Sequence, residues 1–175
     1  MILTGNEIKK RIEKGDIVIS PFNESQLNPN SYNLKLGNWL KKYYVNDYID
    51  IKEKPYTEDV KILDTGYMLK PGELYLGSTE EYTETYDLVP RIEGRSSVGR
   101  LGISVHCSNG FGDIGFKGNW TLCITATVPV IIYPHIEICQ IYYSEISGEP
   151  MLYTSEKYQN SEGINPSKLY LDLKK

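Results

Sequence analysis

Apolar and polar residues alternate with a period of two along most of the chain, which is the pattern of half-buried β-strands. Gly, Pro, Asn and Asp interrupt these runs at short intervals. Many short strands with regular turn signals favour an all-β barrel or sandwich. The expected strands cover residues 17–20, 31–37, 39–45, 48–51, 66–79, 87–94, 102–108, 118–128, 130–134 and 138–146.

One helix is expected before the first strand. Thr4 and Glu7 have the spacing of a capping box, in which each side chain bonds the other residue's backbone N–H. Leu3 and Ile8 can form the hydrophobic staple that fixes the chain's entry into a helix. Gly15 is suited to end the helix in the left-handed conformation. The first fifteen residues therefore predict a short N-terminal helix.

The rest of the chain indicates one domain over residues 1–175, without an internal repeat or linker. The polar stretch at about 153–175 lacks strand alternation and contains Gly163 and Pro166. We expect this stretch to be an arm that becomes ordered on a ligand or partner.

Composition limits the class of protein. The chain has 40% hydrophobic residues, a formal net charge of -4, and no apolar run of the roughly 18 residues that a membrane helix needs. The N-terminus lacks the basic, apolar and small-residue succession of a signal peptide. We therefore expect a cytoplasmic protein (in a host cytoplasm if the source is viral) with no membrane partner. Mild acidity argues against nucleic-acid binding, so any phosphate ligand should be small.

The three cysteines do not predict a metal site. Cys107, Cys123 and Cys139 each lie in an apolar, strand-like run, and no CxxC pair occurs. We expect them to be reduced and buried. A zinc site built from them with His106 and His135 is conceivable, but the paired ligand spacing of such sites is absent.

Residues 90–103, PRIEGRSSVGRLGI, are unusual for an acidic chain because they hold three arginines, two adjacent serines and three glycines. Arginine forks bind phosphate oxygens in bidentate fashion, and serine hydroxyls and backbone amides supply further donors. The segment suggests a phosphate site, with a tight arginine-anchored turn as the structural alternative. It is not a Walker loop, because it lacks the glycine spacing and the G-K-[ST] ending.

Two further segments carry polar side chains at turns. Asp113 lies in the glycine-rich stretch 109–122, NGFGDIGFKGNWTL, where a rigid carboxylate could activate water or bind a sugar hydroxyl. On local chemistry alone, an Asp that closes its own turn is favoured. The stretch 27–37, LNPNSYNLKLG, indicates a polar turn that leads into a strand.

Together, in this order, the three segments resemble the dCTP deaminase branch of the dCTP deaminase and trimeric dUTPase superfamily, especially its archaeal bifunctional deaminase-dUTPase type. The resemblance runs nearly end to end and rests above all on R-S-S-x-x-R-L-G followed by G-x-x-D-x-G-F-x-G. It implies a mainly β fold, a dUTPase-like distorted β-barrel of the β-clip or jelly-roll type. A short N-terminal helix, a C-terminal arm and assembly as a homotrimer belong to the same expectation.

The resemblance also implies a nucleotide site between subunits. Asp113 matches the aspartate that contacts the deoxyribose 3′-hydroxyl and that, in dUTPases, orients or activates the attacking water. Lys157 and Tyr158 match the arm that closes over the phosphates. Mg²⁺ would be ligated mainly by the triphosphate, so no protein metal ligands are expected. The expected catalytic residues are Asp113, Arg100 and Ser96. The expected nucleotide- and phosphate-binding residues are Arg95, Ser96, Ser97, Arg100, Asn109, Asp113, Lys157 and Tyr158.

Several residues depart from the deaminase pattern. Deaminases of this family carry a glutamate in the strand after G-F-x-G that activates the water attacking cytosine, and the matching residue here is Cys123. A thiol lacks the second oxygen of a proton relay, and its pKa rises on burial. Asn109 replaces a small alanine, Asn33 replaces the aspartate of S-Y-D, and Ser161 stands where the arm often has a glutamine. The arm also lacks the glycine-rich fifth motif of dUTPases.

These departures lead to three functional hypotheses. The first is a hydrolase that converts dUTP, or a related pyrimidine deoxynucleoside triphosphate, to the monophosphate and diphosphate, with Asp113 as base or orienter. The second is a dCTP deaminase that forms dUTP and ammonia despite Cys123. The third is a catalytically altered homologue that binds the nucleotide in a regulatory role. The sequence favours the first.

Overall fold

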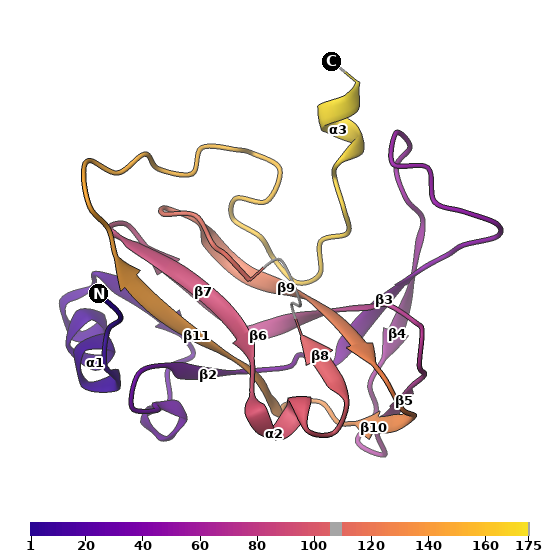
Figure 1. Cartoon of the computed structure of the whole chain (residues 1–175), viewed down its shortest axis with the longest axis horizontal. Coiled ribbons are helices and arrows are strands. Elements are labelled where there is room, and N and C mark those ends of the chain that lie inside the picture. The colour runs from indigo at the N-terminus through magenta and orange to yellow at the C-terminus, as the bar shows by residue number, and fades with distance from the viewer. Residues whose placement is uncertain (106–109, 175) are drawn as a thin grey trace.

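Three β-sheets form the centre of the described part of the molecule, with short helices at the periphery (Figure 1). The computed structural model describes residues 1–105 and 110–174. The helical segments are α1 (Gly5–Lys14), the 3-10 turn η1 (Glu24–Gln26), α2 (Ser96–Gly99) and α3 (Tyr170–Leu173). The strands are β1 (Ile17–Ser20), β2 (Tyr32–Lys35), β3 (Trp39–Tyr43), β4 (Thr57–Lys61), β5 (Tyr67–Leu69), β6 (Tyr75–Thr85), β7 (Leu88–Gly94), β8 (Ile103–Val105), β9 (Lys117–Ala126), β10 (Val130–Ile132) and β11 (Glu137–Glu145).

The largest sheet is organised around two long antiparallel strands, β6 and β9. Its order is β4-β3-β6-β9-β8, and β1 pairs with a further part of β6. A second sheet has the order β2-β11-β7, and β5 pairs with β10 in a third. These sheets hold the two polar segments in place: the arginine- and serine-rich segment lies between β7 and β8, and the glycine-rich turn precedes β9.

One hydrophobic core receives side chains from all three sheets. Leu34 of β2 and Ile141 of β11 belong to the same buried cluster as Leu122 of β9 and Leu69 of β5. On β9 the even-numbered residues from Gly118 to Ala126 are buried and the odd-numbered ones half-buried. This alternation gives one face of β9 to the core and leaves the other face available for a site.

The N-terminal helix is confirmed at the expected place. Thr4 caps α1 by accepting a 3.3 Å hydrogen bond from the backbone N–H of Glu7. Gly15 ends the helix with φ of 82°, a left-handed conformation that glycine adopts without strain. Leu3 and Ile8 are both buried in the core, as the staple requires.

Most of the expected strands are confirmed, and so is the mainly β class. The strands predicted from the alternation were wrong in two places. Residues 48–51 form no strand and lie in irregular backbone. The range 66–79 splits into β5 and the beginning of β6, because Pro71 and Gly72 turn the chain between them. The polar strand β4 was not expected. Residues 106–108 of the expected strand 102–108 lie outside the described residues.

The described helices are all short, and none of them is both long and apolar enough to cross a membrane.

Candidate active site

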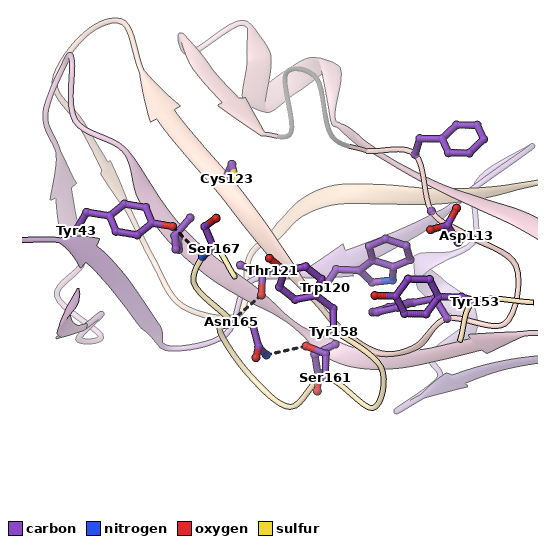
Figure 2. Close-up of a pocket in the computed structure, with 15 residues that line it drawn as sticks. Tyr43, Asp113, Trp120, Thr121, Cys123, Tyr153, Tyr158, Ser161, Asn165 and Ser167 are labelled. Carbon is purple, nitrogen blue, oxygen red and sulfur yellow. Dashed lines mark hydrogen bonds between the residues drawn. The ribbon is translucent and has the colours of Figure 1, made fainter. Parts of the chain in front are cut away.

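A cavity of about 420 Å³ opens between the half-buried face of β9 and the C-terminal arm. Its walls come from segments far apart in the sequence, namely the ends of β3 and β6, the glycine-rich turn before β9, β9 itself and the arm (Figure 2). The lining residues are Tyr43, Leu76, Phe111, Gly112, Asp113, Phe116, Asn119, Trp120, Thr121, Cys123, Tyr153, Tyr158, Ser161, Asn165 and Ser167.

Three polar side chains from β9 form one wall. Asn119, Thr121 and Cys123 are alternate residues, so they point to the same face of the strand. The amide of Asn119 donates to the backbone oxygens of Thr79 and Glu80, at 3.1 and 3.2 Å, which fixes its orientation. The wall is therefore a row of an amide, a hydroxyl and a thiol.

Asp113 lies in the turn that precedes β9. The turn is closed by the backbone oxygen of Asp113, which accepts from the N–H of Phe116 at 3.2 Å. Its exposed carboxylate lines the cavity. Gly112 is needed beside it, because a Cβ there would lie 2.4 Å from the Trp120 ring and 2.8 Å from the Pro90 oxygen. The close approach of backbone to Trp120 thus sets the position of the carboxylate.

The C-terminal arm covers the cavity and is held by hydrogen bonds to its walls. The backbone N–H of Asn165 donates to the Thr121 hydroxyl at 2.9 Å, and that of Ser167 donates to the Tyr43 hydroxyl at 3.0 Å. Ser161 accepts at its backbone oxygen from the N–H of Asn119 at 2.8 Å. Figure 2 shows these arm residues facing the wall of β9. The arm therefore closes the site in this structure, whereas its mobility without ligand stays a prediction.

Burial raises the pKa of Tyr43, and the nearby Cys123 adds to this shift. The hydrogen bond from the Ser167 backbone opposes it. The phenol therefore stays neutral around physiological pH and remains a hydrogen-bonding group at the arm.

The arginine- and serine-rich segment does not reach this cavity within one chain. Arg95, Ser96, Ser97 and Arg100 all lie among the described residues, yet none of them lines the cavity. Ser96 and Ser97 are the first two residues of α2, and Arg95 and Arg100 flank this helix. The segment precedes β8, which pairs with residues 124–126 at the end of β9. In Figure 1, α2 lies at the lower edge and the arm at the upper edge.

The four residues of this segment differ in exposure. Ser96, Ser97 and Arg100 are exposed. Arg95 is half-buried, and its Nη1 lies 3.0 Å from the Glu137 carboxylate. A phosphate could therefore reach the three exposed residues freely and Arg95 only on the open side of its guanidinium.

The remaining predicted site residues have mixed positions. Tyr158 lines the cavity, while the Lys157 ammonium pairs with Asp172 at 2.5 Å. Asn109 lies outside the described residues. Asp113 is thus the only predicted catalytic residue found in the cavity of the described chain.

Cys123 was expected to be buried as strand packing, and this expectation is wrong. It is half-buried and faces the cavity. Cys139 is fully buried in the core, as expected, and burial raises the pKa of its thiol. Cys107 lies outside the described residues.

The cavity also contains residues that the sequence did not predict. Tyr43 and Thr121 hold the arm through their hydroxyls, and neither was predicted as a site residue. The alternation of β9 could have indicated Thr121, because it places this residue on the same face as Cys123. Tyr43 reaches the cavity only through the pairing of β3 with β6.

Among the described residues, no group of three or more His, Cys, Asp or Glu side chains could hold a metal ion. The cavity offers hydroxyls, amides and the Asp113 carboxylate. This oxygen-rich donor set fits a hard cation such as Mg²⁺ only if a ligand brings most of the coordinating oxygens.

Comparison with known proteins points to one family. The family model described as "dCTP deaminase-like" matches residues 2–146. A protein of Hathewaya histolytica named "dCTP deaminase, dUMP-forming" is 56% identical over 173 residues, which are 99% of both chains. A protein of the same name from Clostridium beijerinckii is 54% identical over the full length of both chains.

One solved structure shows a similar fold at low sequence identity. The 2′-deoxycytidine 5′-triphosphate deaminase of Agrobacterium tumefaciens matches 81% of this chain with a TM-score of 0.65 and 18% identity. This chain covers 47% of that protein's length. A dUTPase of Staphylococcus bacteriophage 80alpha matches more distantly, with a TM-score of 0.47 and 13% identity over 82% of this chain and 90% of that one.

Proposed function

Because the chain belongs to the dCTP deaminase-like family, we propose that it is a dCTP deaminase of the dUMP-forming type. The overall reaction consumes dCTP and two waters and releases dUMP, ammonia and diphosphate. The observation that supports it best is the 56% identity over 99% of both chains with a protein of that name. This proposal replaces dUTP hydrolysis alone, which the sequence favoured.

The first half of the reaction replaces an amino group by oxygen. Water adds to C4 of the cytosine ring, and ammonia leaves from the same carbon. Water has to lose a proton and the leaving nitrogen has to gain one, so a proton relay beside the ring accelerates the step. Cys123 lies on the cavity wall, and the resemblance matches it to the family's glutamate. Its thiol is a poorer relay than a carboxylate. Deamination should therefore be the slow half in this chain.

The second half hydrolyses the triphosphate. Water attacks the α-phosphorus, and diphosphate leaves with the electron pair of the broken P–O bond. Asp113 is the carboxylate of the cavity and has the chemistry to orient or deprotonate this water. Arginine forks offset the charge that develops on the phosphate oxygens. When bound, Mg²⁺ would neutralise charge on the triphosphate, whose oxygens would hold it.

Two subunits are needed to complete this site. Arg95, Ser96, Ser97 and Arg100 do not line the cavity of their own chain, although the family resemblance assigns them to the phosphates. We infer that a second copy brings them to the cavity that holds Asp113. A homotrimer with three such shared sites fulfils this requirement.

A second candidate function is dUTP hydrolysis without deamination. The observation that favours it is Cys123 on the cavity wall, where a deaminase would place its glutamate. The Asp113 half of the site would be kept, and the half that acts on the cytosine ring would be lost.

Product analysis separates the candidates. The protein is incubated with dCTP or dUTP and Mg²⁺, and nucleotides, ammonia and diphosphate are quantified separately. Equal amounts of dUMP and ammonia from dCTP support the proposal. Formation of dUMP from dUTP, with no ammonia from dCTP, supports the second candidate. Saturable binding without any product would contradict both and leave a regulatory nucleotide-binding role.

A further inference from the structure

A chain of polar side chains lies behind the arginine- and serine-rich segment, on the sheet β2-β11-β7. Asn33 belongs to β2, Glu137 begins β11, and Arg95 directly follows β7. β11 is the central strand, so Glu137 stands between the other two residues. The register of β11 against β2 shifts between Glu137 and Cys139, and such irregularities re-aim side chains at the edge of a sheet.

Glu137 contacts Arg95 with two of its oxygens. Arg95 Nη1 donates to the backbone oxygen of Glu137 at 2.9 Å and lies 3.0 Å from its carboxylate Oε2. Both contacts fall on Nη1, so among the described residues Nη2 and Nε are the nitrogens left for a ligand. The Arg95 side chain is 33% exposed, which leaves the guanidinium open on one side.

Asn33 orients Glu137 from behind. Its Nδ2 donates to the same Glu137 Oε2 at 2.7 Å, and its Oδ1 accepts from the Asn28 amide at 2.7 Å. Asn33 is only 5% exposed, so its own side chain is largely shielded from bulk water. An amide can donate and accept at once, and both capacities are used here.

We propose that Glu137, oriented by Asn33, is a positioning residue that presets the Arg95 guanidinium for the phosphates of the nucleotide. The proposal rests on the proposed function, because it takes Arg95 as a phosphate-binding residue. A fork that is already fixed loses less side-chain entropy when a phosphate arrives, which tightens binding. Glu137 itself touches neither phosphate nor base in this account.

The positioning of Arg95 depends on an amide side chain at residue 33. Asn33→Asp would replace the Nδ2 donor by a carboxylate oxygen at the same 2.7 Å from Glu137 Oε2. Two carboxylates at that distance repel each other and compete for Arg95. The double variant Asn33→Asp, Glu137→Gln again has one donor and one negative charge in the pair. The amide donor is then at position 137 and the carboxylate at position 33.

The test measures affinity for the non-hydrolysable triphosphate analogue dUpNHpp by calorimetry, together with the melting temperature. We expect Glu137→Gln and Asn33→Asp each to weaken binding about tenfold, the scale of a charge-assisted hydrogen bond, at little change in melting temperature. The double variant should recover most of the lost affinity, because the two positions are in contact. Glu93→Gln is the matched control, since it removes the same charge from an exposed position of β7 and should bind as the wild type.

Failure of the positioning role can be told apart from failure of the proposed function. Unchanged affinity in both single variants overturns the positioning role. Losses in affinity that follow losses in melting temperature, without recovery in the double variant, show that the contacts only stabilise the fold and overturn it too. A wild-type protein that binds no pyrimidine nucleotide contradicts the proposed function itself, and the inference falls with it.

Discussion

At the scale of single residues, Cys123 and Asp113 divide the proposed chemistry between them. Both line the cavity, but they come from different elements, β9 and the turn before it. Each half-reaction can therefore be changed without removing the side chain that serves the other.

Cys123→Glu should raise ammonia release from dCTP about 10²-fold, the lower end of the gain from a positioned proton-transfer group. Stopped assays of ammonia against time provide the measurement. Cys123→Gln is the matched control, because it has the same shape as the glutamate but cannot relay a proton. An equal gain in both variants would mean that volume, not proton transfer, limits the step.

Asp113→Asn should lower diphosphate release from dUTP about 10²-fold, because the amide cannot take a proton from water. Diphosphate is measured directly, and binding of dUpNHpp checks that the site still forms. Turnover near the wild-type rate with intact binding would remove Asp113 from the chemistry.

The buried carboxyl group of Glu81 should make the free energy of unfolding depend on pH. It is 1% exposed and accepts from the Gln26 amide and the Lys35 backbone, at 2.8 and 2.9 Å. Burial raises its pKa above the ordinary 4.5 in spite of these bonds. The folded state therefore holds this proton more tightly than the unfolded state, so its contribution is fully present below 4.5 and is lost as the pH rises through the folded pKa.

Glu81→Gln remains neutral over this range and tests the sign. The melting temperature of the wild type minus that of the variant should shrink as the pH rises from about 4.5 towards neutrality. Thermal melts in matched buffers measure this difference. A difference that grows with pH would show that the folded state favours the ionised carboxylate instead.

At the scale of elements, the arm depends on close approach to β9. A Cβ at Gly118 would lie 2.6 Å from both the backbone nitrogen and the backbone oxygen of Ser161, and the φ of Gly118 is 142°. Gly118→Ala should therefore displace the arm and lower turnover at least about tenfold, the scale of a misplaced positioning group. Limited proteolysis of the arm measures the displacement.

Gly148→Ala is the control for backbone strain. Gly148 also has a positive φ, of 91°, but no atom lies within 4 Å of its Cβ position. This variant should keep both the closed arm and its turnover.

Truncation before Lys157 should abolish turnover and leave the fold intact, and retained turnover in the truncated form would exclude the arm from catalysis.

The elements show what the sequence could and could not predict. Local signals were sufficient for α1, whose caps lie within its own fifteen residues, and for strands with one apolar face. They failed for β4, where Thr57–Lys61 has few apolar residues and is held by its pairing with β3. They failed for the cavity residue Tyr43 for the same reason, since strand pairing places it and no local pattern does.

The candidate site was predicted mainly from resemblance, and only in part. Asp113 and Tyr158 were found in the cavity, because a glycine-rich turn and a polar arm are recognisable from short motifs. The support of Arg95 by Glu137 joins residues 42 positions apart, and no local rule indicates it.

At the scale of the whole molecule, activity should require assembly. Light scattering should show a homotrimer, and a stable monomer with full activity would contradict the shared site. A mixing experiment is sharper. Arg100→Ala and Asp113→Asn proteins should each be inactive, yet together regain activity after subunit exchange.

The size of the recovery follows from symmetry. If each site takes α2 from one subunit and the Asp113 turn from its neighbour, random exchange restores roughly a quarter of wild-type activity. Recovery requires exchange, so mixing without a denaturation and refolding step is the control. No recovery after confirmed exchange would place both residues in the site of one chain.

The thiol on the cavity wall also gives this protein a chemical handle. A carboxylate in that place does not react with mild alkylating agents, whereas a cysteine does when the reagent can reach it. A pyrimidine nucleotide that carries a weak electrophile on its base could therefore form a permanent bond to Cys123 while leaving relatives with glutamate there untouched. The residue that we propose slows deamination would then make selective covalent inhibition possible.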